Sequence, residues 1–199
     1  MLETIREFGL EQLTRTAELE AARRAHAMVY LSLAEEAERR LTGAEQKIWL
    51  QQLETEQDNF RAALHWAMDH QAGELLQRMA AALQPFWFAS GHWSEGRRWL
   101  EESLAMDTSI MPDQSVRAKV LYGAGMLARF QGDLARARML CEQSLALYRS
   151  LADKTGALKS LAQLSRITYF QDDQPAMDAF LAEAAFLIED MPPSRWNIC

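Results

Sequence analysis

Cysteine, proline and glycine are scarce in this sequence of 199 residues, which contains 2, 5 and 9 of them. The two cysteines, Cys141 and Cys199, cannot build a disulfide framework, and such sparse use suits a reducing compartment such as the cytoplasm. Few helix-breaking residues, together with abundant Ala, Leu, Glu, Gln and Arg, favour helices over sheet. The composition therefore predicts an all-α protein.

Long hydrophobic runs are also missing. The stretch Met79–Ala89 is interrupted by Gln84 and Pro85 and is too short to cross a bilayer. The first ten residues carry charges where a secretory signal needs an apolar run. The formal net charge of −7 argues against nucleic-acid binding through the overall field. We therefore expect a cytoplasmic chain that binds neither membrane nor nucleic acid directly.

The residue patterns that support catalysis or metal binding are absent from the sequence as well. Two distant cysteines cannot complete a zinc site, and no two histidines lie three or four residues apart. The stretch GHWSEGRR (Gly91–Arg98) imitates a phosphate-binding loop but lacks the preceding strand, the Lys and the hydroxyl residue. We interpret it as a turn in which Ser94 caps a helix. The sequence thus predicts no enzymatic activity, no cofactor and no metal site, with Cys141 a buried, inert thiol.

The strongest positive signal is the stretch Leu121–Leu147, which has the pattern of two amphipathic helices joined at residues 131–133. Gly125 in the first helix and Ala137 in the second are small enough to let the helices pack closely. Gly132 can adopt the left-handed conformation that ends a helix, and Asp133 can cap the next one. We therefore predict a tight helical hairpin here.

The same turn occurs at Gly91 and at Asp172, so the hairpin repeats about every 40 residues. Small residues, hydrophobic partners and the Gly-Asp turn resemble the tetratricopeptide repeat (TPR), whose period is about 34. One hairpin buries too little surface to fold alone, so we expect hairpins stacked as a TPR-like right-handed solenoid. A helical bundle without repeats is the alternative.

The expected helices can be placed along the chain. Following a short helix at 2–13, they span about 17–41, 74–89, 95–106, 114–130, 134–151, 155–170 and 175–190. A single further helix follows a capping box formed by Thr42 and Glu45 and runs to about His70.

Three segments occur in this order in one known family. They are MLETIREFGLEQL, then RRAHAMVYLSLAEEAERRLTGAEQKIWLQQLETEQDNFRAALHWAM, then GHWSEGRRWLEESL. The sequence resembles bacterial transcriptional regulators built on a STAND-class signal-transduction ATPase, whose C-terminal half is a TPR array. The resemblance implies that residues 1–16 end a winged-helix or linker segment and that 17–72 form a helical hairpin leading into the array. Residues 73–193 would then hold three TPR-like repeats, and 194–199 a tail.

The same resemblance implies a noncatalytic, effector-sensing module. Its partner would be the ATPase and DNA-binding module of the parent protein, which these residues do not contain. The alternative function is a self-association scaffold that forms homo-oligomers. An all-helical enzyme is the least favoured alternative, because the sequence contains no acid/base pair, nucleophile or metal-ligand cluster.

In TPR arrays the first helix of each hairpin lines the concave face, so its outward positions can be projected. The projected groove consists of Arg78, Phe88, Lys119, Tyr122, Met126, Arg129, Lys159, Gln163, Arg166 and Tyr169. Five of these residues are basic and none is acidic, in a chain of net charge −7. An acidic peptide or another anionic effector, bearing a carboxylate or phosphate, could bind there through charge-assisted hydrogen bonds. The alternative is a solvated face whose Lys and Arg stems cover apolar neighbours.

Overall fold

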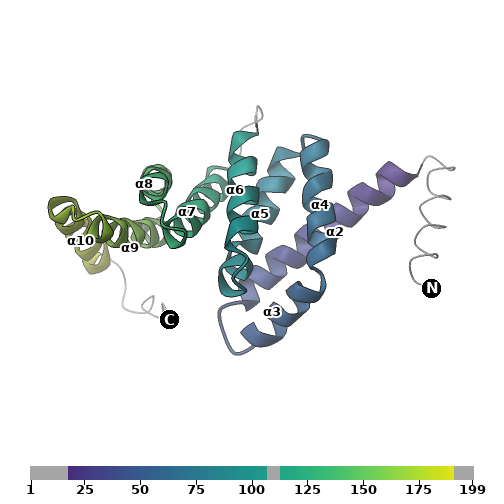
Figure 1. The fold of residues 1–199 in the computed structure, drawn as a ribbon, viewed down its shortest axis with the longest axis horizontal. Coiled ribbons are helices and arrows are strands. Elements are labelled where there is room, and N and C mark those ends of the chain that lie inside the picture. Colours follow the sequence, from purple (N-terminus) through teal and green to yellow (C-terminus); the bar gives the residue numbers. More distant parts are fainter. Residues whose placement is uncertain (1–17, 107–112, 191–199) are drawn as a thin grey trace. The chain divides into compact units, whose positions relative to one another are not determined.

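The structure is a computed structural model that describes residues 18–106 and 113–190. These ranges contain helices and no strands, as the composition predicts (Figure 1). The helices are α2 (Leu19–Arg40), α3 (Gln46–Thr55), α4 (Gln57–Asp69), α5 (Gly73–Ala89), α6 (Trp93–Ala105), α7 (Gln114–Phe130), α8 (Leu134–Ser150), α9 (Lys154–Phe170) and α10 (Gln174–Glu189). The expected segments at 1–16 and 194–199 lie outside the described residues.

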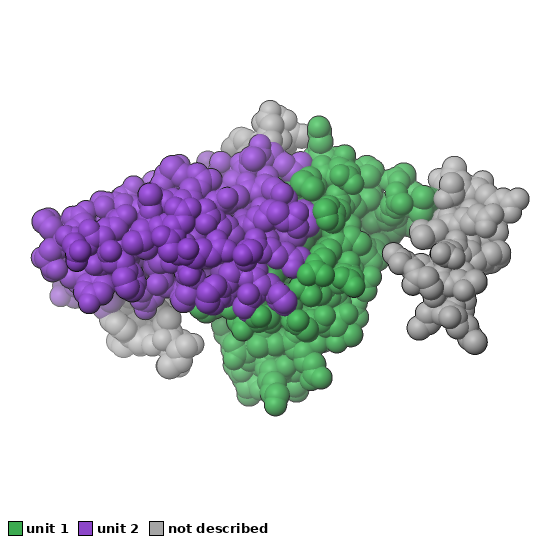
Figure 2. Space-filling model, in the orientation of Figure 1, with its two compact units in different colours: residues 1–90 green, residues 91–199 purple. Residues whose placement is uncertain are grey.

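The chain divides into two compact units, Met1–Ser90 and Gly91–Cys199, which are coloured separately in Figure 2. The boundary falls in the turn of the first expected repeat, so α5 belongs to the first unit and α6 to the second. Both hairpins of the segment α7–α10 lie within the second unit.

In the first unit, α2 packs against α4 and α5, and α3 makes lighter contacts with the same helices. The expected single helix after Thr42 is wrong in two respects. Its capping box does not form, because Glu45 precedes α3 without any side-chain hydrogen bond to the helix. The helix also breaks at Glu56, whose carboxylate accepts a hydrogen bond of 2.6 Å from the Tyr30 hydroxyl of α2. The local sequence around Glu56 could not predict this break, because the hydrogen bond comes from Tyr30, 26 residues earlier in the chain.

In the second unit, α7 to α10 follow a regular plan of helices joined by short turns. The aspartates Asp133, Asp153 and Asp173 are evenly spaced along the chain, and each caps the following helix with its carboxylate. The residue before each aspartate has a left-handed φ of 81°, 53° or 54°. In each turn the aspartate amide also donates to a carbonyl near the end of the preceding helix, which satisfies that helix end. The predicted turn at Gly132 and Asp133 is therefore confirmed, and it occurs three times.

Helices in this unit pack in chain order, α6 on α7, α7 on α8, α8 on α9 and α9 on α10. Such short turns force neighbouring helices to run in opposite directions (Figure 1). A Cβ at Gly125 would lie 2.6 Å from Cys141 Sγ and 3.2 Å from the Ala137 carbonyl oxygen. The predicted close approach of these two helices is confirmed. Alternate helices also meet, so α7 and α9 lie side by side and share one face of the unit.

Candidate anion-binding site

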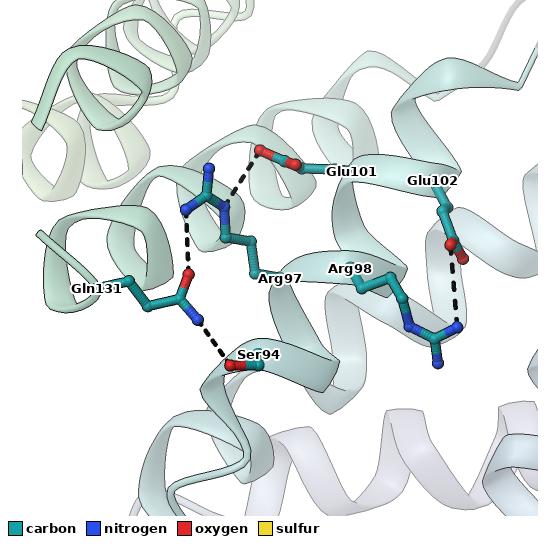
Figure 3. Close-up of a pocket in the computed structure, with 6 residues that line it drawn as sticks. All are labelled: Ser94, Arg97, Arg98, Glu101, Glu102 and Gln131. Atoms are coloured by element: carbon teal, nitrogen blue, oxygen red, sulfur yellow. Dashed lines mark hydrogen bonds and ion pairs between the residues drawn. The ribbon is translucent and has the colours of Figure 1, made fainter. Parts of the chain in front are cut away.

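Two of the hollows in the described part of the second unit are lined by arginine. The first has a volume of about 490 Å³ and is lined by Ser94, Arg97, Arg98, Glu101, Glu102 and Gln131 (Figure 3). Its cations are already paired within the protein. Arg97 lies 3.4 Å from Glu101, and Arg98 lies 3.9 Å from Glu102. This hollow therefore offers little unsatisfied positive charge to a ligand.

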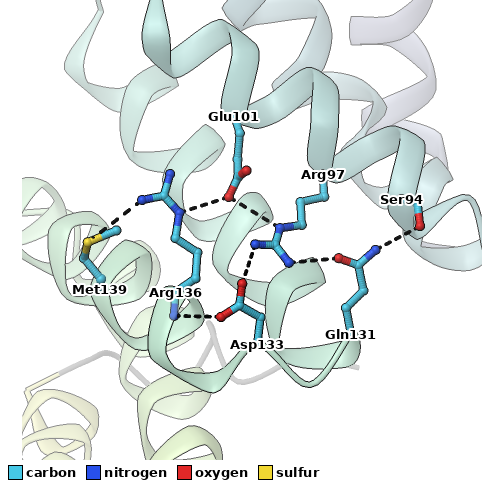
Figure 4. A network of polar contacts seen from close by, with 7 residues as sticks. All are labelled: Ser94, Arg97, Glu101, Gln131, Asp133, Arg136 and Met139. Carbon is cyan, nitrogen blue, oxygen red and sulfur yellow. Dashed lines mark hydrogen bonds and ion pairs between the residues drawn. The ribbon is translucent and has the colours of Figure 1, made fainter.

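Arg97 connects α6 to the turn after α7 (Figure 4). Its guanidinium donates to Gln131 Oε1 at 3.0 Å and to Asp133 Oδ2 at 2.6 Å. Gln131 in turn donates to the Ser94 hydroxyl at 3.1 Å. Burial opposes the charged form of Arg97, but Asp133 and Glu101 outweigh it, so the pKa of Arg97 is raised. The stretch that imitates a phosphate-binding loop thus supplies an arginine that links two helices, and we call Arg97 with Gln131 and Asp133 the clamp. Ser94 lies inside α6 and does not cap it, so that expectation was wrong.

The same clamp recurs in the next hairpin. Arg138 of α8 donates to Gln171 Oε1 at 3.3 Å and to Asp173 Oδ2 at 2.8 Å. Sequence reasoning missed this pair of contacts. A repeated combination of residues could have revealed them. Arg97 lies early in its helix and is followed by the Gln-x-Asp turn at 131–133. Arg138 likewise is followed by the Gln-x-Asp turn at 171–173.

Replacing Arg97 with glutamine tests the clamp. We expect the free energy of unfolding to fall by about 1 kcal/mol, at the low end for charge-assisted hydrogen bonds because Asp133 is partly exposed. Arg117→Gln provides the control, since Arg117 forms no ion pair with a described residue, and it should change stability by less than about 0.5 kcal/mol. Urea denaturation of the two variants measures the difference. Equal losses would show that the clamp contributes nothing of its own.

The second hollow has a volume of about 680 Å³ and lies where the C-terminal ends of α7 and α9 meet α10. It is lined by Arg129, Phe130, Ser165, Arg166, Tyr169, Phe170, Met177 and Leu181. The described lining thus contains two arginines, several apolar side chains and no carboxylate. This combination of free cations and apolar walls distinguishes it from the first hollow.

Arg129 is held in place by its neighbours. Its Nε donates to Gln163 Oε1 at 2.9 Å, and its guanidinium carbon lies 4.2 Å from the centre of the Phe130 ring. Gln163 is fixed in turn, because its Nε2 donates to the Tyr122 hydroxyl at 3.5 Å. The two terminal nitrogens of Arg129 have no hydrogen-bond partner among the described residues. A fork of two parallel N–H donors is therefore oriented and unused.

Arg166 supplies the second positive charge of this hollow. Burial lowers the pKa of Arg129 first, and the nearby charge of Arg166 lowers it further. In the described ranges neither arginine forms an ion pair with a carboxylate. By contrast, Arg97, Arg136, Arg138 and Arg149 in the same unit all do. Two cations that disfavour each other therefore lie together here without a counter-charge among the described residues, an arrangement that could bind an anion.

The structure brings together half of the projected groove. Tyr122 and Arg129 from α7 meet Gln163 and Arg166 from α9, and Tyr169 lines the same hollow. Burial raises the pKa of the Tyr122 hydroxyl, which is therefore a neutral hydrogen-bonding group.

The other five projected residues have other environments. Met126 is buried, with 7% of its surface exposed, and Gln163 of the first group is buried too, at 4%, so the projection of these two outward was wrong. The side chains of Lys119 and Lys159 are exposed and do not line the hollow. Arg78 lies in the first unit and pairs with Glu35 at 2.7 Å, and Phe88 is half-buried in that unit.

Sequence reasoning missed the apolar part of the site. Phe130 and Phe170 are the last residues of α7 and α9, and each directly follows a basic or aromatic groove residue. Their equivalent places in successive hairpins are the signal that could have identified them. Met177 and Leu181 come from α10, a helix that the projection did not include.

Metal ligands do not gather in the part of the chain that the structure describes. No group of three or more His, Cys, Asp or Glu side chains in residues 18–106 and 113–190 is placed to hold a metal ion. Likewise, none of the described helices is both long enough and apolar enough to span a membrane.

Three curated relatives match the chain along its whole length. One comes from Mycobacterium bovis and two from strains of Mycobacterium tuberculosis, and each is described as a "Putative HTH-type transcriptional regulator". Each is 28% identical to this chain over 213 aligned residues. The chain spans 23% of the length of these relatives. No protein-family model matches the sequence. The relatives' names agree with the transcription-regulator part of the family resemblance and mention neither an ATPase nor a TPR array.

Proposed function

We propose that this chain is the noncatalytic, effector-sensing part of a cytoplasmic transcriptional regulator, built as a TPR-like right-handed solenoid. An anionic effector or acidic peptide would occupy the face shared by α7 and α9. Its occupancy would regulate the ATPase and DNA-binding module of a longer parent protein. Such regulation requires the effector to bind two states of the array with different affinity.

The observation that carries this proposal is the pair Arg129 and Arg166, two cations that line a hollow without a carboxylate. The evenly spaced, aspartate-capped turns support the repeat architecture. The names of the three relatives support the role in transcription.

A thermal-shift screen of the whole chain against anionic metabolites and acidic peptides tests the proposal. We expect at least one anion to raise the melting temperature in a saturable way, because a ligand that binds only the folded state stabilises it. The double variant Arg129→Glu/Arg166→Glu should lose this response while keeping its helical circular dichroism. If every anion acts equally on both proteins, the hollow is not an effector site.

A second function, self-association, is favoured by α10. This helix has no fully buried residue, and it leaves Leu181 and Phe186 exposed by 49% and 71%. Light scattering across concentration tests the idea, with Phe186→Lys expected to weaken any dimer. A monomer at all concentrations would remove this candidate.

A further inference from the structure

We infer that the occupant of the second hollow is a compact organic carboxylate with an apolar body, and not an extended acidic peptide. This inference rests on the proposed function and specifies the class of its ligand. It follows from three properties of the hollow: its donors, its walls and its extent.

The donors suit a carboxylate. The Nε of Arg129 is occupied by Gln163, so its two terminal nitrogens form a fork that matches the two oxygens of one carboxylate. Ser165 cannot add a free donor without losing a bond, because its hydroxyl already donates to the Leu161 carbonyl at 2.9 Å. Arg166 is then the one further cationic donor in the described lining. A phosphate would find a donor for its third oxygen in Arg166, so the donors admit both anions and the walls favour a carboxylate that carries an apolar body.

The walls suit an apolar body attached to that carboxylate. Phe130 covers one face of the Arg129 guanidinium, and Tyr169 and Phe170 pack edge to face with their ring centres 5.5 Å apart. Met177 and Leu181 of α10 complete the apolar lining. An oligomer of Asp and Glu would place charged side chains against these residues, where they find no hydrogen-bond donors and bury no apolar surface of their own.

The extent suits a small molecule. A volume of about 680 Å³ falls in the range of about 300–1,000 Å³ that is typical of small-ligand pockets. An extended peptide would need the groove to continue along α7 and α9 towards Lys119 and Lys159. The lining of the hollow contains neither lysine, and Met126 and Gln163, which lie between, are buried.

Titration calorimetry and thermal shift of the whole chain test this inference with four classes of probe. The first is carboxylates, namely 4-phenylbutyrate and the alkyl series from acetate to decanoate. The others are the neutral analogue 4-phenylbutan-1-ol, phenyl phosphate, and a blocked hexapeptide of alternating Asp and Glu. We expect the aryl or longer alkyl carboxylates to bind most tightly and the alcohol to bind at least about tenfold more weakly, because it forms no charge-assisted bond.

Three variants assign the effect to the fork. Arg129→Gln removes the fork and Arg129→Lys keeps the charge without it, so both should weaken carboxylate binding by about tenfold or more. Arg117→Gln is the matched control, since Arg117 also lies on α7 without an ion pair to a described residue but does not line the hollow. Its affinity should equal that of the unaltered chain.

The possible failures are distinguishable. If the hexapeptide or phenyl phosphate binds more tightly than every carboxylate and requires Arg129, the inference falls while the proposed anion site stands. If the alcohol binds as well as the carboxylate, the inference is likewise overturned. If no probe binds more weakly to the Arg129 variants or to the double variant Arg129→Glu/Arg166→Glu, the inference and the proposed function both fail.

Discussion

Replacing Gly156 with alanine is expected to lower the free energy of unfolding by about 2 kcal/mol, because the site has no room for a methyl group. The added Cβ would lie 2.2 Å from Cδ1 of Tyr148, whose ring packs on this glycine and is almost fully buried. Overpacking costs about 1–3 kcal/mol, and a distance of 2.2 Å to a buried ring places this clash at about 3 kcal/mol. Alanine's better helix propensity returns about 1 kcal/mol, which leaves the net loss of about 2 kcal/mol. Urea denaturation measures the change.

A double-mutant cycle with Tyr148→Ala separates this clash from other effects. Tyr148→Ala alone should cost about 3–5 kcal/mol, as truncation of a buried aromatic ring does. In that background Gly156→Ala should stabilise the protein by about 1 kcal/mol, a coupling of about 3 kcal/mol. Gly132→Ala is the control, because its cost comes from a φ of 81° with open space around the Cβ. The cost of Gly132→Ala should be the same with or without the Tyr148 ring. If Gly156→Ala also had equal effects in both backgrounds, the Tyr148 ring would not pack against Gly156.

The thiol of Cys141 is expected to be almost unreactive in the folded protein. The side chain is fully buried at the interface of α7 and α8, and burial raises the pKa of its thiol from 9.0 to about 12. At pH 8 this shift lowers the fraction of thiolate, the reactive form, by about a thousandfold. Exclusion of the reagent by packing slows the reaction further.

The rate is measured with a chromogenic disulfide reagent in a Cys199→Ser variant, in which Cys141 is the remaining cysteine. The same variant unfolded in guanidinium chloride gives the reference rate and should react at least about a thousandfold faster. A native rate within about tenfold of this reference would mean that Cys141 is accessible and that the α7–α8 interface is open.

The sequence predicted the second unit well because its determinants are local. Each turn needs a left-handed residue followed by a capping aspartate, and the Gly132-Asp133 pair indicates both. At residues 152 and 172 the left-handed position holds Ala and Asp, so the turn there depends on packing and capping more than on glycine. The helix ends in α7 to α10 agree with the predicted ones to within a residue or so.

The first unit and the candidate site could be predicted only in part, because contacts between distant segments decide them. The helix break at Glu56 coincides with a hydrogen bond from Tyr30, which lies on another helix. In the site, helical periodicity placed Arg129 and Arg166 on one face but could not show that Met126 and Gln163 of the same stripes are buried. The aromatic residues that complete the hollow come from helix ends, and its aliphatic residues come from α10, which no single helical stripe reveals.

The most direct test of the anion site is the side-chain NMR spectrum of the arginine Nε–H groups during titration with 4-phenylbutyrate. Assigned through single substitutions, the Arg129 and Arg166 signals should shift and saturate together. Those of Arg97 and Arg138 should stay in place, because their Nε–H groups donate to Glu101 and Glu142 and their terminal nitrogens donate to Asp133 and Asp173. Unchanged Arg129 and Arg166 signals, or shifts centred on the clamped pair, would contradict the account.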